Sequence, residues 1–148
     1  MEEPVMNVTQ LSVFLENKPG SLQKILNLLG TSGINITTLT IAETPDFGVL
    51  RMIVNKTDLA RQILKDNHIT AAATQVLAIE IPDHPGALAR AVGILSDRDV
   101  NIEYMYAYAN RQKDQAVMIF RFDNIETAKE ALAGAGFRIV RATDITGK

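Results

Sequence analysis

The sequence predicts an α+β fold of two βαββαβ units, each a four-stranded antiparallel sheet with both helices on one face. Three observations predict it: an internal duplication, segments of alternating apolar and polar residues, and intervening segments with apolar residues at helical spacing. A shift of 66 residues superposes identical residues, namely Leu11 on Leu77, Pro19 on Pro85, Gly20 on Gly86, Leu22 on Leu88, Leu29 on Leu95, Asn35 on Asn101 and Ile36 on Ile102.

The duplication divides the chain into two predicted domains, residues 1–72 and 73–148. Later in each copy the shift becomes 68, which pairs Ala60 with Ala128 and Leu64 with Leu132. The second copy therefore has a loop that is two residues longer. Two copies are too few for a solenoid, which needs three or more stacked repeats. Each copy is expected to fold as a small domain that packs against the other, because a chain of about 60 residues buries little surface alone.

The first half of each copy predicts a strand followed by a helix. Apolar residues alternate with polar ones at Leu11, Val13 and Leu15, and again at Leu77, Ile79 and Ile81. This period is typical of a strand that is buried on one face. A Pro-Gly pair follows, and then apolar residues at helical spacing: Leu22, Ile25, Leu26 and Leu29, or Leu88, Ala91, Val92 and Leu95. The first helix is expected to end near Gly30 or Gly33, and its second copy near Asp97 or Asp99.

The second half of each copy predicts a hairpin, a shorter helix and a last strand. The hairpin strands are residues 34–42 and 49–55 around a turn at 44–48, or 100–109 and 116–122 around 110–114. The shorter helix carries Leu59, Ile63 and Leu64, or Ile125, Ala128, Ala131 and Leu132. The last strand begins near Ile69 or Phe137. With right-handed crossovers this order gives a ferredoxin-like sheet whose first and third strands are central.

The composition is that of a soluble globular protein and excludes several classes. The chain has 148 residues, of which 47% are hydrophobic and 22% charged. No apolar run reaches the roughly 18 residues of a membrane helix, and the acidic start at Glu2 and Glu3 differs from the basic start of a signal peptide. We therefore expect a cytoplasmic protein without membrane contact. Fifteen basic against 17 acidic residues, and a pI of 5.7, argue against nucleic acid as a partner.

Catalysis and metal binding also find little support. The chain has no Cys, so thiolate nucleophiles and Cys-ligated zinc are excluded. Its two histidines, His68 and His84, are not duplicated, and no nucleophile with a matching base recurs. A run that begins at Asp97 resembles the start of a calcium loop, but Ile102 stands where that loop requires Gly. No enzyme activity, cofactor or metal is expected.

The duplicated residues outside the expected core fall at the strand-to-helix turn and at the start of the second strand. They are Asn17, Gly20, Ser21, Leu22, Asn35 and Ile36, with their counterparts Asp83, Gly86, Ala87, Leu88, Asn101 and Ile102. Both places are expected at one end of the fold. Backbone N–H groups at the helix start, with glycine beside them, form a ready site for a carboxylate. An asparagine side chain both donates and accepts, as recognition of a zwitterion requires. A structural alternative stays open: Pro-Gly starts the helix, Asn17 and Asp83 cap it, and Asn35 holds a turn.

These motifs, Pro-Gly-x-Leu at the turn and Ile/Val-Asn-Ile at the second strand, resemble the ACT domain, a small regulatory module of amino-acid metabolism. The resemblance covers nearly the whole chain, twice. It implies that two units join through their second strands and first helices into one eight-stranded sheet, with an amino acid bound at the interface. It also implies that Asn17 and Asp83 touch the ligand, and that Asn35 and Asn101 reach it from across the interface. Serine-binding ACT domains place a histidine where this chain has Leu15 and Ile81.

All three tyrosines lie on one face of one predicted strand, at Tyr104, Tyr106 and Tyr108. Packing between domains or subunits is the expected role, since tyrosine is enriched at interfaces, and a pocket for a ligand side chain is the alternative. An RNA-binding sheet shares the βαββαβ order but carries its aromatics on the central strands. The function expected is a stand-alone sensor that forms a homodimer, binds an amino acid or related carboxylate and regulates a partner enzyme. The alternative is a ligand-free platform for protein interaction or dimerisation.

Overall fold

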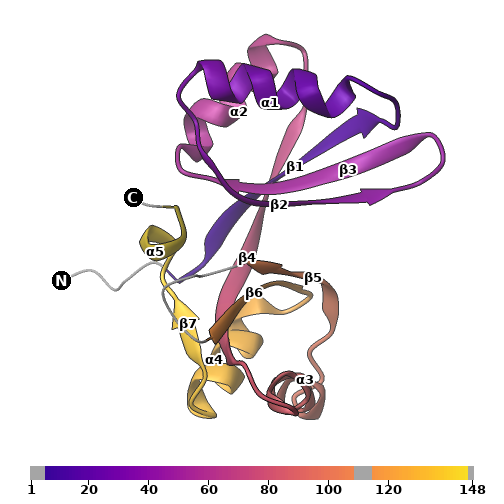
Figure 1. Ribbon diagram of the computed structural model, residues 1–148. Coiled ribbons are helices and arrows are strands. Elements are labelled where there is room, and N and C mark those ends of the chain that lie inside the picture. The colour runs from indigo at the N-terminus through magenta and orange to yellow at the C-terminus, as the bar shows by residue number, and fades with distance from the viewer. Residues whose placement is uncertain (1–5, 109–114, 147–148) are drawn as a thin grey trace. The chain divides into compact units, whose positions relative to one another are not determined.

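A computed structural model describes residues 6–108 and 115–146, and its contacts divide the chain into two compact units (Figure 1). The N-terminal unit is built on Thr9–Thr74 and the C-terminal unit on Gln75–Asp144. The first half of the chain forms β1 (Val8–Glu16), α1 (Ser21–Thr31), β2 (Ile36–Glu43), β3 (Phe47–Val54), α2 (Thr57–Asp66) and β4 (Ala71–Pro82). The second half forms α3 (Ala87–Asp97), β5 (Ile102–Tyr108), β6 (Gln115–Phe122), α4 (Ile125–Gly134), β7 (Arg138–Val140) and α5 (Ala142–Thr146).

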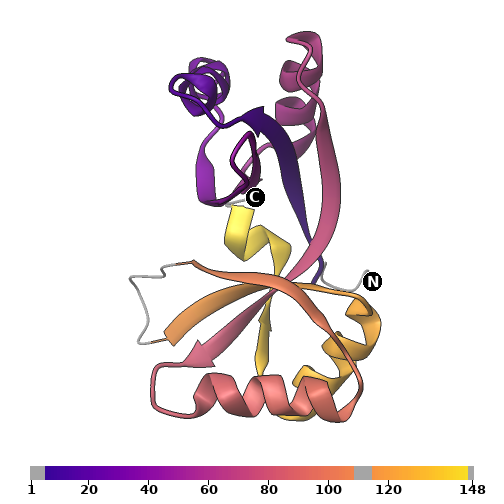
Figure 2. The ribbon, with the colours of Figure 1, turned by 90° about the vertical axis from the view of Figure 1, so that its right-hand side faces the viewer.

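The predicted α+β fold with two βαββαβ units is confirmed. The strand order is β2-β3-β1-β4 in the first unit and β5-β6-β4-β7 in the second, so the first and third strands of each are central. Figure 2 shows α3 and α4 on the same face of their sheet, and Figure 1 shows α1 and α2 covering one face of theirs. The short helix α5 was not predicted, because its five residues are too few to show a helical period.

One strand serves both units. The strand expected from Ile69 and the strand expected around Leu77 are the single 12-residue strand β4. No Gly or Pro interrupts it before Pro82, so nothing in the sequence breaks the extended backbone. The predicted domain boundary between residues 72 and 73 falls inside this strand and remains a prediction.

The second strands β2 and β5 stand at the two ends of the strand order. Among the described strands, β2 pairs with β3 and β5 pairs with β6. The eight-stranded sheet joined through the second strands, which the family resemblance implied, is thus not formed by the described strands of one chain. The strand order runs through β4 instead.

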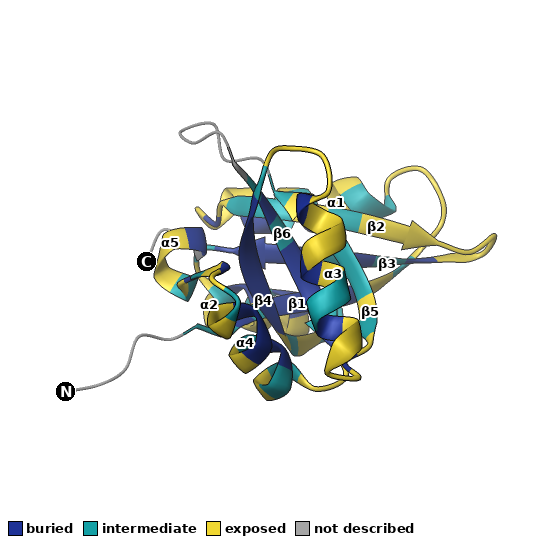
Figure 3. Cartoon of the chain, turned by 90° about the horizontal axis from the view of Figure 1, so that it is seen from below, coloured by how far each residue is buried: buried dark blue, intermediate teal, exposed yellow. Residues whose placement is uncertain are grey.

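Each unit has its own apolar core between its sheet and its helices. In the N-terminal unit the alternating residues Leu11 and Val13 of β1 pack with Ile25 and Leu29 of α1. In the C-terminal unit Leu77 and Ile79 occupy the same place against α3. Figure 3 shows the buried central strands β1 and β4 and the exposed outer faces of the helices. The apolar periods therefore identified the buried faces of the central strands, whereas three residues of the predicted apolar helix faces, Leu59, Leu88 and Val92, are exposed.

The first helix of each unit ends as predicted, through a left-handed residue. Gly33 has φ of 75°, and its counterpart Asp99 has φ of 59°. The next amide then closes the helix end: Ile34 N–H donates to the Leu29 carbonyl, and Val100 N–H donates to the Leu95 carbonyl, both at 3.0 Å. In the described part of the chain, no helix is both long and apolar enough to cross a membrane.

Candidate ligand-binding site

The strand-to-helix turns of the two units have the same hydrogen bonds. In the first turn Lys18 N–H donates to the Glu16 carbonyl at 2.9 Å, Ser21 N–H to Lys18 at 3.3 Å and Lys24 N–H to Gly20 at 3.0 Å. In the second turn the backbone N–H of His84 donates to the Pro82 carbonyl at 3.0 Å, that of Ala87 to the His84 carbonyl at 3.2 Å and that of Arg90 to the Gly86 carbonyl at 2.9 Å. The duplication therefore extends to backbone geometry as well as to residue type.

The glycine of each turn has a backbone conformation that favours glycine. Gly20 has φ of 92° and Gly86 has φ of 86°, and each is the N-cap of its helix. A Cβ built on either would meet no atom within 4 Å. The space above both glycines is therefore open, as a bound molecule requires. The positive φ is by itself sufficient reason for glycine at these two positions.

The helix start offers fewer amides than expected. Ser21 and Ala87 donate within the turn, so their N–H groups are engaged, although both were predicted to face a ligand. No side chain caps α1 or α3. The first N–H groups of a helix lack partners inside it. The N–H groups that follow Ser21 and Ala87 are those of Leu22 and Leu88, and these are the ones that could bind a ligand. Leu22 also packs its side chain on the core, whereas Leu88 is exposed.

Asn17 holds the β2–β3 hairpin rather than the helix. Its N–H donates to the Asp46 carbonyl at 3.0 Å. Its Nδ2 donates to the Thr44 carbonyl at 3.1 Å and to the Glu43 carboxylate at 3.3 Å. The alternative interpretation of Asn17 as a helix cap is thus wrong. In the second unit the equivalent turn, predicted at 110–114, lies outside the described residues.

A cavity of about 350 Å³ opens at the first turn. It is lined by Gly20 and Ser21, by the charged Lys18 and Lys24, and on its apolar side by residues that include Ile69. The carboxylate of Glu16 also lines the cavity and forms an ion pair with Lys18 at 3.3 Å, which leaves Lys24 as the cation best placed for an anion. A second groove, of about 520 Å³, runs along α1 and shares Gly20 and Lys24 with the cavity.

The asparagines of the second strands lie far from the turns of their own units. Glu16 pairs with Phe47 at one end of the sheet, whereas Ile36 pairs with Val54 at the other end. Because β2 has eight residues that rise about 3.3 Å each, Asn35 lies about 25 Å from the turn. The expectation that both places share one end of the fold is therefore wrong. The helix α1 carries the chain back along the sheet before β2 begins.

The main chain of each asparagine closes the open end of its hairpin. Asn35 N–H donates to Oδ1 of Asn55 at 3.0 Å, and Asn55 N–H donates to the Asn35 carbonyl at 3.1 Å. Asn101 and Asp123 repeat the exchange at 3.0 and 3.2 Å. Both asparagines are exposed. Four apolar residues of the predicted set contribute to the cores instead: Ala87 is part of one, and Leu22, Ile36 and Ile102 pack against them.

The three tyrosines share the helix-free face of their sheet. Tyr104, Tyr106 and Tyr108 pair with Arg121, Ile119 and Val117 of β6. Met105 points the other way and packs on the core. All three tyrosines are half-buried. The single face predicted for them is confirmed.

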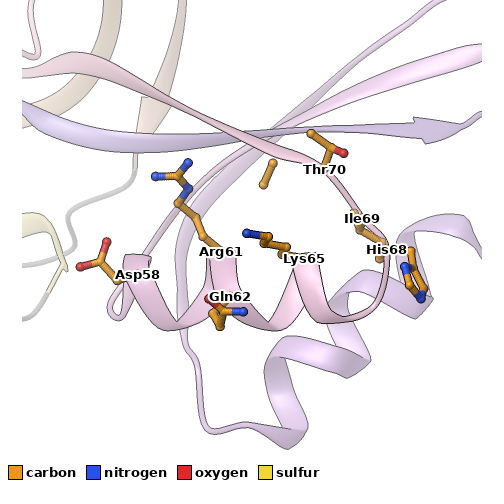
Figure 4. Close-up of a pocket in the computed structure, with 8 residues that line it drawn as sticks. Asp58, Arg61, Gln62, Lys65, His68, Ile69 and Thr70 are labelled. Carbon is orange, nitrogen blue, oxygen red and sulfur yellow. The ribbon is translucent and has the colours of Figure 1, made fainter.

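One pocket was missed by the sequence reasoning. It has a volume of about 490 Å³ and lies between α2 and the start of β4 (Figure 4). Its walls carry Arg61, Lys65, His68 and Thr70. The i, i+4 spacing of Arg61 and Lys65 was the available signal, since it sets two cations on one face of a helix. Within the described residues, no group of three or more His, Asp or Glu side chains could hold a metal ion.

Comparison with known families decides the classification. The model of the family described as "ACT domain pair" matches residues 6–147. The chain belongs to this family. Among solved structures, this ACT domain pair is similar to protein BT0572 from Bacteroides thetaiotaomicron, with 42% identity, a TM-score of 0.89, and 95% of this chain and 96% of that chain covered.

Two proteins named as regulatory or small subunits also resemble this ACT domain pair. The regulatory subunit of aspartate kinase from Thermus thermophilus shares its fold, with a TM-score of 0.60, 19% identity and 86% and 92% of the two chains covered. The acetolactate synthase small subunit of Buchnera aphidicola subsp. Baizongia pistaciae is 30% identical over 77 residues, which is 50% of this chain. The chain spans about half (48%) of the length of that relative.

Proposed function

We propose that this ACT domain pair is a non-catalytic intracellular regulator that binds an amino acid or a related small carboxylate at its strand-to-helix turn. The observation that carries the proposal is the cavity at the first turn, where Lys24 and the start of α1 face open space above Gly20. A carboxylate suits this place, because the helix dipole and the ammonium group both favour negative charge.

The other half of the site requires a second unit. Asn35 lies at the opposite end of its own sheet, so it cannot share a ligand with the turn of that unit. A unit that lies antiparallel alongside brings its asparagine to the turn of its neighbour. The ligand is then held at the interface between two ACT units, and a homodimer is one way to supply them.

The two turns are not equivalent, and the first is the better carboxylate site. The counterpart of Lys24 is Arg90, whose guanidinium donates to the Ala135 carbonyl at 2.9 Å and lies 4.7 Å from the centre of the Phe137 ring. That cation is already engaged in the fold. Asp83 also places a negative charge where the first turn has the neutral Asn17. Tight binding is therefore expected at one turn.

The effect of the ligand would pass to a partner protein. One similar protein is named as the regulatory subunit of aspartate kinase and another as the small subunit of acetolactate synthase. We infer that this chain likewise regulates an enzyme in trans. A ligand shifts such an equilibrium only by its differential affinity for the two states.

A ligand-free platform for protein interaction is the second candidate. It is favoured by exposed apolar side chains on the second strand and on a first helix. Leu39 and Ile41 of β2 are 38% and 40% exposed, and Leu88 and Val92 of α3 are 38% and 36% exposed. These side chains are available to a second copy or to another protein.

Calorimetry of the full chain against the L-amino acids and small carboxylates tests the proposal. We expect one of these compounds to bind, and Lys24→Gln to weaken its binding at least tenfold. The control variant is Lys56→Gln, which removes an exposed cation of the same unit that lines none of the described cavities. A screen without binding, or equal affinity in Lys24→Gln, would contradict the sensor and favour the platform.

A further inference from the structure

We propose that the pocket between α2 and the start of β4 binds the phosphate group of a small metabolite. The pocket is separate in chemistry from the turn that carries the proposed function, because its polar walls come from α2 and from the segment that leads into β4. Its volume of about 490 Å³ lies within the usual range for pockets that hold small molecules.

Two exposed cations, Arg61 and Lys65, line this pocket together with one carboxylate, that of Asp58. Figure 4 shows the side chains of Arg61 and Lys65 reaching from α2 toward β4, where Thr70 adds a hydroxyl group. Among the described residues, neither cation forms an ion pair. The carboxylate of Asp66 on the same helix instead accepts a hydrogen bond from Gln62 at 2.7 Å. Both side chains are exposed, so solvent screens the two like charges, and an anion placed between them would be attracted by both.

The third basic group is His68, which follows the end of α2. Its φ of 62° is left-handed, a conformation that is less favourable for a residue with a side chain than for glycine. The conformation is held by two backbone bonds, His68 N–H to the Lys65 carbonyl at 3.0 Å and Ile69 N–H to the Leu64 carbonyl at 2.8 Å. The side chain of His68 is exposed and lines the pocket.

The second copy shows that the fold needs none of these charges. At the 68-residue shift, His68 corresponds to Gly136, whose φ is 89°. Lys65 corresponds to Ala133. Arg61 corresponds to Lys129, which forms an ion pair with Glu126 at 3.1 Å. The same helix and turn therefore form with glycine, alanine and a neutralised lysine, so the cationic set of the first unit is not required for folding.

Phosphate is the anion that suits this set. A guanidinium binds a phosphate through two parallel hydrogen bonds, and an ammonium group acts as a further point charge. The Thr70 hydroxyl and the His68 ring add donors at the edge of the same pocket. The net charge of −2 disfavours a nucleic-acid backbone as the source of phosphate. A free phosphate ion and a phosphate ester remain as sources of the same chemistry.

Titration of the full chain with inorganic phosphate and with simple phosphate esters, at constant ionic strength, tests the proposal. Phosphorus NMR and calorimetry provide the affinity. We expect saturable binding that weakens at least tenfold in Lys65→Ala and in His68→Gly. Both variants install the residue of the second copy and are expected to fold, and His68→Gly is expected to melt at the same temperature or higher.

The matched control is Lys129→Ala, which removes a cation at the position equivalent to Arg61 and should leave phosphate affinity unchanged. Tighter binding of an ester than of inorganic phosphate would support a metabolite. Equal or tighter binding of inorganic phosphate would overturn the proposal that the ligand is a phosphorylated metabolite. Absence of saturable binding, or an affinity in both Lys65→Ala and His68→Gly equal to that of the original chain, would overturn the site itself. Neither result bears on the amino-acid site, which is tested separately by Lys24→Gln.

Discussion

Asn35 and Asn55 exchange two hydrogen bonds across the open end of the β2–β3 hairpin, through the backbone of the first residue and both the backbone and side chain of the second. Asn101 and Asp123 make the same exchange in the second unit. Asparagine and aspartate offer the same acceptor oxygen, so the duplication has kept the bond while the residue changed. The side chain of Asn35 takes no part in this bond and is exposed.

The free energy of unfolding should therefore depend on whether residue 55 has a side-chain acceptor oxygen. We expect Asn55→Ala to lower the free energy of unfolding by about 1 kcal/mol, since it removes one hydrogen bond. Asn55→Asp keeps the acceptor and should cost less. Urea denaturation of the two variants measures the difference. Equal loss in both would mean that the Oδ1 bond contributes nothing.

Ligand affinity, unlike stability, should depend on the side chain of Asn35. The Asn35→Ala variant keeps the N–H and carbonyl that close the hairpin, so the midpoint of unfolding should stay close to that of the original chain. Affinity for the amino-acid ligand should fall by about 1 to 3 kcal/mol if the side chain meets a charged group of the ligand. Calorimetry of Asn35→Ala and Asn101→Ala separates the two effects. Unchanged affinity in both variants would remove asparagine from the site.

Substitution of Asn17 should affect the hairpin first. Removal of its side chain breaks the bond to the Thr44 carbonyl and the weaker contact with Glu43. We expect Asn17→Ala to lower stability by about 1 kcal/mol and to speed amide exchange at the hairpin tip. Hydrogen exchange followed residue by residue checks this. If exchange at Phe47 stayed at its original rate, the hairpin would not depend on Asn17.

The turn glycines are poor probes of ligand approach. Gly20→Ala and Gly86→Ala should each destabilise the chain by about 1 to 2 kcal/mol, because an L residue is strained at these positive φ values. Thermal unfolding of both variants measures this loss. A loss of ligand binding in Gly20→Val would mix strain with obstruction, whereas the exposed Lys24 carries no such strain. A Gly20→Ala variant as stable as the original would refute the backbone argument.

Ile69 lines both the cavity at the first turn and the pocket beside α2. If both proposed ligands bind, each should change the affinity of the other by the same factor, as linkage requires. Calorimetric titration of the amino acid with and without phosphate measures that factor. Ile69→Val, which shortens the shared side chain, should bring the factor closer to one. A factor of one in the original chain would show that the two cavities are independent.

Much of the fold could be predicted from the sequence because the apolar period reports which face is buried. Leu11 and Val13, like Leu77 and Ile79, were assigned to a core face that the structure confirms. The continuity of β4 was missed, since a strand end is recognised by breakers and the stretch from Ala71 to Ile81 contains none. Periodicity tells which face is buried and says nothing of where one repeat gives way to the next.

The candidate site was predicted less well, because its geometry depends on hydrogen bonds that no residue pattern reveals. The roles of Asn17 in the hairpin and of Ser21 within the turn depend on where the chain folds back on itself. The distance between Asn35 and the turn follows from the strand register, which only the folded sheet defines. The pocket beside α2 was not predicted because two of its basic residues, Lys65 and His68, correspond to Ala133 and Gly136 in the second copy and so leave no duplicated pattern.

The shared strand β4 also limits where the chain can be cut into fragments that each contain one copy. Residues 71–74 belong to one unit and residues 75–82 to the other, with no linker between them. A cut at any point in the strand leaves one fragment without part of its sheet edge and bares backbone N–H and C=O groups. Such fragments would be prone to associate through those edges. We therefore expect the two copies to fold together, and gene fragments that encode one copy each to give aggregated protein.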